Sequence, residues 1–155
     1  MITVENLVVD SVTRVVKSFY PNATIKSERV DVPSSFPFVS IVEADNSTYR
    51  KTQDDESREH HVEVMYEVNV YSNLKNGKKT EARKILSLVD DVLQEMKFTR
   101  ITKLPIDNNK SYYRYVARYT AVVGYSLDMV LPSEELYPSE DLLPSDSILY
   151  QFYRK

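Results

Sequence analysis

The stretch Val-Glu-Val-Met-Tyr-Glu-Val-Asn-Val-Tyr-Ser, residues 62–72, decides the fold of this chain. Valine or tyrosine stands at every second position from Val62 to Val70, and the positions between are mostly polar. Because successive side chains of a strand point to opposite faces, this alternation predicts a long strand with one buried face. A short polar turn and an amphipathic helix follow, so we expect a sheet that is covered by a helix.

That helix is the most strongly patterned one in the sequence. Between residues 78 and 96 the apolar side chains recur at steps of three and four, which places them on one stripe facing a sheet. A second helix is predicted near the start, with Thr3 as its N-cap, an apolar repeat over residues 4–19 and Pro21 at its end. The apolar stripe of the helix over residues 78–96 consists of Ala82, Ile85, Leu86, Val89, Val92, Leu93 and Met96.

Four further segments favour strands, and a polar stretch separates one of them from the strand over residues 62–72. Residues 45–60 are polar throughout and predict a long, mobile hairpin loop, while Phe38, Ile41 and Val42 are the core residues expected just before it. The predicted strands are residues 24–30, 38–44, 98–104 and 112–125, with a turn at 105–110.

The order of these elements predicts an α+β fold. Helix, three strands, helix and two strands give a four- to five-stranded antiparallel or mixed sheet with two helices packed on one face. In the last strand both faces carry apolar groups, so we expect the second face to be partly covered by something other than the helices. One face holds Tyr113, Tyr115, Ala117, Tyr119, Ala121, Val123 and Tyr125, and the other holds Arg114, Val116, Arg118, Thr120 and Val122.

Composition excludes several classes of function. The chain has 155 residues, 20 basic and 23 acidic side chains, a net charge of -3, two glycines and no cysteine. It is the size of one domain, is not generally basic like a nucleic-acid-coating protein, and lacks thiolate metal sites and glycine-rich phosphate loops. No apolar run is long enough for a bilayer span and no signal-peptide pattern is present, so we expect a soluble protein without an export signal of its own.

No constellation of residues predicts catalysis. His60 and His61 are adjacent, so in a strand they point to opposite faces and are poorly placed to share a metal ion. The acidic side chains crowd a loop or, as with Asp90 and Asp91, a helix surface rather than a pocket. We therefore predict no enzyme activity, no cofactor and no metal site. Single-stranded nucleic-acid binding by the Tyr-Arg strand stays open as an alternative, although Arg114 and Arg118 alternate with the tyrosines and lie mainly on the opposite face.

The last part of the chain departs from the α+β pattern. Residues 128–155 contain a repeat of apolar residue, proline, serine and acidic residue with a period of six. Such a segment is too short and too rich in proline for another core layer, which divides the chain into a domain at 1–127 and a C-terminal arm at 128–155. The arm is either a solvated tail or a clasp whose Leu131, Tyr137 and Leu143 enter pockets on a neighbouring subunit while residues 148–153 add to a partner sheet edge.

Several short motifs within residues 1–126 together resemble one protein family. Residues 68–73 close the long strand, Glu81-Ala82 and Val89-Asp90-Asp91 lie in the helix, and Phe98-Thr99-Arg100 leaves it. Tyr113-Arg114 and Arg118-Tyr119-Thr120 stand in the last strand. With these motifs the chain resembles the tail terminator and tail-to-head joining proteins of long-tailed bacteriophages. The C-terminal arm is not part of this resemblance.

The resemblance implies a structural virion protein without catalytic or cofactor residues. Such a subunit would form a homo-oligomeric ring, a hexamer, that caps the tail tube, joins it to a head-completion or connector protein and lets genomic DNA pass without sequence-specific binding. It would be made in the cytoplasm of the host bacterium and reside in the tail or neck of the virion, with no membrane partner. The alternatives are another phage neck or head-completion adaptor, or a non-viral protein-interaction module without catalytic activity. The candidate channel-lining residues are Asp54, Asp55, Glu56 and Glu59, and the candidate interface residues are Tyr71, Arg114, Arg118, Leu131, Tyr137 and Leu143.

Overall fold

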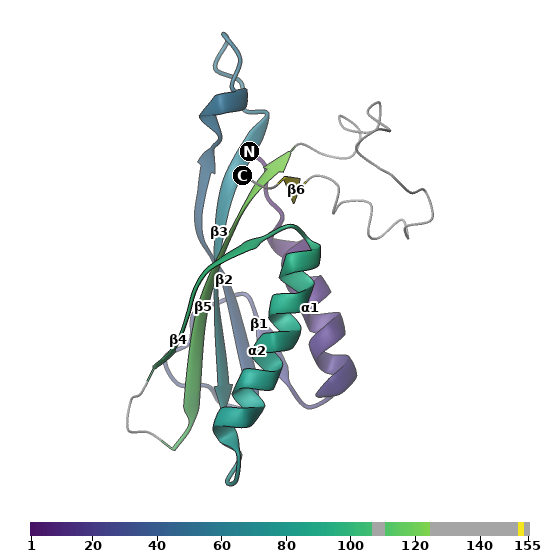
Figure 1. Cartoon of the computed structure of the whole chain (residues 1–155), viewed down its shortest axis with the longest axis vertical. Helices are drawn as coiled ribbons and strands as arrows, with labels where there is room; N and C mark the ends of the chain where they lie inside the picture. Colours follow the sequence, from purple (N-terminus) through teal and green to yellow (C-terminus); the bar gives the residue numbers. More distant parts are fainter. Residues whose placement is uncertain (107–110, 125–151, 154–155) are drawn as a thin grey trace.

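The chain folds into a mixed sheet with two helices on one face, as the order of elements predicted (Figure 1). The structure, a computed structural model, describes residues 1–106, 111–124 and 152–153. Strand order is β1-β2-β3-β5-β4, with β6 paired to β5; β1 runs parallel to β2 and the other pairs are antiparallel. The elements are α1 (Glu5–Phe19), β1 (Thr24–Lys26), β2 (Phe38–Thr48), the 3-10 turn η1 (Arg50–Thr52), β3 (His61–Ser72), α2 (Lys78–Glu95), β4 (Thr99–Ile106), β5 (Tyr113–Gly124) and β6 (Phe152–Tyr153).

The main core lies between the sheet and the two helices. All five alternating residues of β3, from Val62 to Val70, are completely buried on this face. They pack with the buried stripe of α2 and with Val8, Val12 and Val16 of α1. Both helices therefore bury one face against the sheet, and the predicted stripe of α2 is confirmed. Phe19, expected on the apolar stripe of α1, is exposed because α1 ends there, beyond the edge of the core.

The second face of the sheet is partly covered by the chain itself. Residues 27–37, which connect β1 to β2, cross this face, and the hydroxyl of Tyr71 donates a hydrogen bond of 3.1 Å to the carbonyl oxygen of Val30. A small aromatic cluster forms underneath from Phe38, Tyr71 and Tyr112, with Phe36 and Val30 packed against it. The prediction of a strand over residues 24–30 was therefore too long, because the chain leaves the sheet after Lys26.

The first four residues form an anchored segment instead of a capped helix start. Ile2 and Val4 are buried whereas Thr3 is exposed, and no side chain caps α1. The backbone of Ile2 is held at both polar groups: its N–H donates to Glu59 at 3.0 Å, and its carbonyl accepts from Asn46 at 2.9 Å. Thr3 as an N-cap was thus wrong, because the apolar side chains beside it are drawn into the core.

The β2–β3 hairpin is longer than the sequence indicated. β2 continues to Thr48 and pairs with β3 through a register shift between Glu43 and Asp45, so residues 45–48 and 50–52 of the predicted loop over residues 45–60 are strand or η1. In Figure 1 this hairpin extends beyond the other strands at the top of the view. β4 likewise continues through Pro105 to Ile106, where a turn was expected.

The C-terminal arm lies almost entirely outside the described residues. Within it the structure places Phe152 and Tyr153, which pair with Val123 and Val122 of β5 in the same chain. This contact differs from the expected addition to a partner's sheet edge. The domain boundary at residue 127 and the rest of the arm also fall outside the described part of the chain.

Candidate interaction surface

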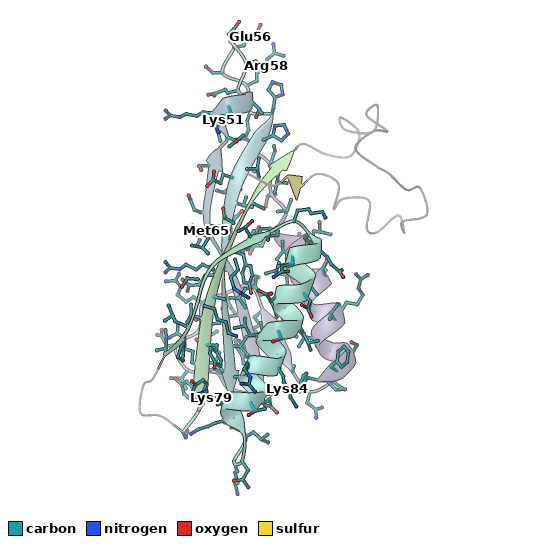
Figure 2. All side chains as sticks on the ribbon, viewed as in Figure 1. Lys51, Glu56, Arg58, Met65, Lys79 and Lys84 are labelled. Carbon is teal, nitrogen blue, oxygen red and sulfur yellow. The ribbon has the colours of Figure 1, made fainter. Side chains whose placement is uncertain are left out.

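The face of the sheet opposite α1 and α2 carries a row of mostly polar side chains at the border of the area that residues 27–37 cover. We call this row the open face, and it consists of Met65, Glu67, Asn69, Arg114 and Arg118. β3 and β5 supply it because these residues alternate with the core residues of the two strands. Figure 2 shows Met65 on the side of the sheet away from the helices.

Glu67 is the centre of this row. Its side chain is only 9% exposed, and Arg118, directly opposite in the β3–β5 register, donates to its carboxylate at 3.1 Å from both Nε and a terminal nitrogen. Arg29, from the crossing segment, approaches the other carboxylate oxygen at 3.8 Å. The arginine side chains remain 52% and 67% exposed, so the buried negative charge is compensated by two cations that still face solvent.

Asn69 extends the network along β3. Its amide nitrogen donates to Glu67 at 3.3 Å, and its amide oxygen accepts from Nε and a terminal nitrogen of Arg114 at 3.0 and 2.7 Å. The guanidinium of Arg114 also lies over the ring of Tyr71, 5.5 Å from its centroid. The buried Glu67 and Asn69 therefore hold Arg118 and Arg114 in fixed orientations. The remaining N–H groups of the two guanidinium groups are preorganised as hydrogen-bond donors.

The electrostatics of Glu67 follow from these contacts. Burial by itself raises the pKa of this carboxyl, but hydrogen bonds from Asn69 and Arg118 and the charges of Arg118 and Arg29 outweigh it and lower the pKa below its ordinary value. Glu67 is thus ionised at neutral pH, and the network is an ion pair rather than a neutral hydrogen-bonded cluster.

A second polar cluster lies on the helix side of the sheet and holds α2 against the strands. The carboxylate of Asp90 accepts from the hydroxyl of Tyr119 and from Arg100, each at 2.8 Å, and from Gln94 at 2.7 Å. Burial, followed by the hydrogen bond to Asp90 and its charge, raises the pKa of Tyr119 far above its usual range, so its hydroxyl stays a donor. Three of the motifs that carry the family resemblance meet in this cluster, which joins α2 to β4 and β5.

The four candidate channel-lining acids are gathered at the β2–β3 hairpin but differ in their surroundings. Asp54 accepts from the backbone N–H groups of Glu56 and Arg58 at 3.0 and 2.8 Å and so orders the turn. Glu59 is held by Ile2 and by the hydroxyl of Thr48. Asp55 is exposed, and the exposed Glu56 forms an ion pair with Arg58. Figure 2 shows Lys51, Glu56 and Arg58 together in the end of the hairpin, so its charge is mixed.

The structure separates the candidate interface residues into three groups. Arg114 and Arg118 lie together on the open face. Tyr71 is only 2% exposed and packs beneath residues 27–37, so its ring contributes to the chain's own folding rather than to a surface. Leu131, Tyr137 and Leu143 lie outside the described residues.

The sequence indicated that the polar face of residues 62–72 would meet a neighbouring subunit, but it did not single out Glu67, Asn69 and Met65 as site residues. The signal was present, since these residues occupy the alternate positions of β3 that the buried valines leave. Their partners could not be identified, because Glu67 meets Arg118 only in one of the possible registers between β3 and β5.

The described part of the chain shows neither a metal-binding cluster nor a membrane-spanning helix. Over residues 1–106, 111–124 and 152–153, no three histidine or acidic side chains gather closely enough to hold a metal ion. Neither α1 nor α2, the helices in this part of the chain, is long and apolar enough to cross a membrane. Comparison of the sequence with protein-family models and with curated proteins gave no match.

Proposed function

We propose that this protein is a structural subunit of a bacteriophage tail or neck, which assembles with copies of itself into a ring that caps the tail tube and joins it to the head. The observation that carries the proposal is the open face, where Glu67 and Asn69 hold Arg118 and Arg114 in place on the sheet face opposite α1 and α2. Fixed arginines beside a half-buried methionine are typical of protein interfaces.

The sheet edges favour association through this face. β4 forms one edge and is interrupted by Pro105, which has no N–H to donate, and by a register shift between Arg100 and Thr102. Lys103 adds a charge to the same edge, and β1 at the opposite edge has three residues. Such features hinder addition of a further strand, so contacts between subunits are expected to use faces rather than edges.

A structural role also agrees with the way the polar side chains are used. The hydrogen bonds of Asp90 hold α2 against β4 and β5, and those of Asp54 and Glu59 hold the hairpin. Each of these carboxylates is engaged in the chain's own folding. We therefore propose a non-catalytic adaptor that needs no cofactor.

Passage of DNA is the part of the proposal that concerns the β2–β3 hairpin. Between residues 50 and 59 the hairpin holds four acidic and three basic side chains. A surface of nearly balanced charge attracts phosphates weakly, which would let DNA slide past without sticking. Asp55 and Glu56 are the acids best placed to face a channel, because Asp54 and Glu59 point into the hairpin's own hydrogen bonds.

The test is the molar mass of the full chain in solution. Light scattering over a range of concentrations should give a multiple of 18.0 kDa, and negative-stain electron microscopy should show closed rings. The substitution Met65→Glu should reduce assembly, because it buries an unpaired charge in the proposed interface.

A control substitution on the helix side shows whether the loss of assembly is specific to the open face. Asn6→Glu adds the same charge at an exposed position of α1 and should leave the molar mass unchanged. A chain that stays monomeric at every concentration, or equal effects of the two substitutions, would exclude the proposed assembly.

A further inference from the structure

A groove lies between the end of α1 and the middle of α2, on the helix side of the molecule. It is open to solvent, has a volume of about 420 Å³ and is lined by Phe19, Tyr20, Arg83, Lys84, Ser87 and Leu88. Phe19 is 67% exposed here. An exposed aromatic ring in a groove is a contact site for another apolar side chain.

The charged lining of the groove is basic. Across the described residues, neither Arg83 nor Lys84 has an ion-pair partner. Lys79 adds a further positive charge one turn before Arg83, and Figure 2 shows Lys79 and Lys84 along the lower part of α2. The groove therefore suits a ligand that combines apolar side chains with negative charge.

The chain itself contains a segment of that chemistry. Residues 131–146 repeat an apolar residue, proline, serine and an acidic residue, and they hold five acidic and no basic side chains. We propose that the groove of one subunit binds the central repeat, Tyr137-Pro138-Ser139-Glu140, of a second copy. The ring of Tyr137 would pack on Phe19 and Leu88, and Glu140 would pair with Arg83 or Lys84.

The positions of the arm's two ends show how far the central repeat can reach. The segment leaves β5 at Gly124 and returns to it at Phe152, beside His61 and hence near the start of α1. The groove lies at the other end of α1, about 22 Å away for a helix of 15 residues. Tyr137 is 13 residues from Gly124, a separation that spans up to about 43 Å. The chain length therefore allows the central repeat to reach the groove of its own chain or that of another copy, and the proposed assembly is the reason for assigning it to the other copy.

This inference rests on the proposed assembly, and cross-linking of the full chain tests it separately. The protein has no cysteine, so each introduced thiol is unique. Chains carrying Ser139→Cys, which keeps Tyr137 and Glu140, are mixed with chains carrying Ser87→Cys and oxidised with glutathione disulfide. A disulfide between the two kinds of chain is expected, and it should be absent when Ser87→Cys is replaced by Lys51→Cys at the hairpin.

Charge reversal tests the chemistry of the contact. Arg83→Glu with Lys84→Glu should lower the yield of the mixed disulfide about tenfold, because like charges would then face each other. Lys75→Glu with Lys97→Glu makes the same change of net charge at exposed positions outside the groove and should leave the yield unchanged.

The remaining outcomes overturn the inference in distinguishable ways. A disulfide that forms only within a chain carrying both cysteines would assign the groove to the chain's own arm. A ring that assembles without any mixed disulfide would remove the groove contact and leave the proposed function standing. A chain that is monomeric at all concentrations would remove both.

Discussion

Asp90 joins the helix layer to the sheet through two hydrogen bonds, from Tyr119 of β5 and Arg100 of β4, and accepts a third from Gln94 of its own helix. Removal of its carboxylate leaves the buried Tyr119 hydroxyl without this acceptor, and a buried hydrogen bond to a charged group contributes about 1.5–3 kcal/mol. We expect Asp90→Ala to lower the free energy of unfolding by about 2–3 kcal/mol in urea titrations. Asp91→Ala, at the exposed neighbouring position, should change it by less than about 0.5 kcal/mol. Similar losses for both variants would show that the three hydrogen bonds contribute little.

Glu67 gives the stability of the chain a dependence on acid pH. Its pKa in the folded protein lies below the ordinary value of 4.5, so its ionised form stabilises the fold above that pH. This stabilisation is lost as the pH falls from about 4.5 through the lower folded pKa. The difference in the free energy of unfolding between the wild type and Glu67→Gln should therefore become smaller toward low pH. Urea titrations between pH 3 and 6 measure this difference. A difference that stays constant would mean that Glu67 does not contribute through its charge.

The roles of Asp90 and Glu67 could not be predicted from the sequence, because their partners lie on separate strands of the sheet. Asp90 was expected on a solvated helix surface because it is charged, although its spacing of four residues from Leu86 and three from Leu93 places it on the buried side of α2. Its partners come from β4 and β5, and only the fold brings Arg100 and Tyr119 to it. Arg114 and Arg118 could be placed on one face of β5 by alternation alone, and the structure confirms that face.

At the scale of elements, Asp54 organises the end of the β2–β3 hairpin. Its carboxylate accepts from two backbone N–H groups, and the bond from Arg58 is the main cause that lowers its pKa. We expect Asp54→Ala to speed hydrogen exchange and tryptic cleavage at Arg58 without changing global unfolding, because the hairpin end lies outside the core. Asp55→Ala, at an exposed position beside it, should leave both unchanged. If Asp54→Ala lowered global stability instead, the hairpin would be part of the cooperative core.

The periodicity of apolar residues predicted the elements that bury one face. It failed for the end of β2, where both faces of the strand contact solvent. The stripe of α2 and the alternation of β3 are complete, so those elements were predicted within a residue or two. The second half of β2 reads Asp45, Asn46, Ser47 and Thr48, which has no apolar alternation and was assigned to a loop. It forms a strand because backbone hydrogen bonds to β3 continue past the last buried residue.

At the scale of the whole molecule, the described domain contains its own complete core. The buried cluster is built from α1, α2 and the strands β2, β3 and β5, together with residues 1–4 and neighbouring segments. Within the described residues, β6, paired at Val122 and Val123, is the part of the arm that contacts this core. The open face and the groove lie on opposite sides of this domain, so one subunit can use both surfaces at once.

Removal of residues 128–155 should therefore separate folding from assembly. The truncated chain keeps the whole described core and loses the β5–β6 pairing, which makes few backbone hydrogen bonds, so its free energy of unfolding should fall by no more than about 1–2 kcal/mol. Assembly should weaken more strongly, because each subunit loses the acidic repeat that the groove of its neighbour is proposed to bind. Sedimentation velocity of both chains over the same concentration range measures this difference, and denaturant titrations provide the stability. A truncated chain that assembles like the full chain would confine the interface to the open face, whereas a truncated chain that unfolds would make the arm part of the core.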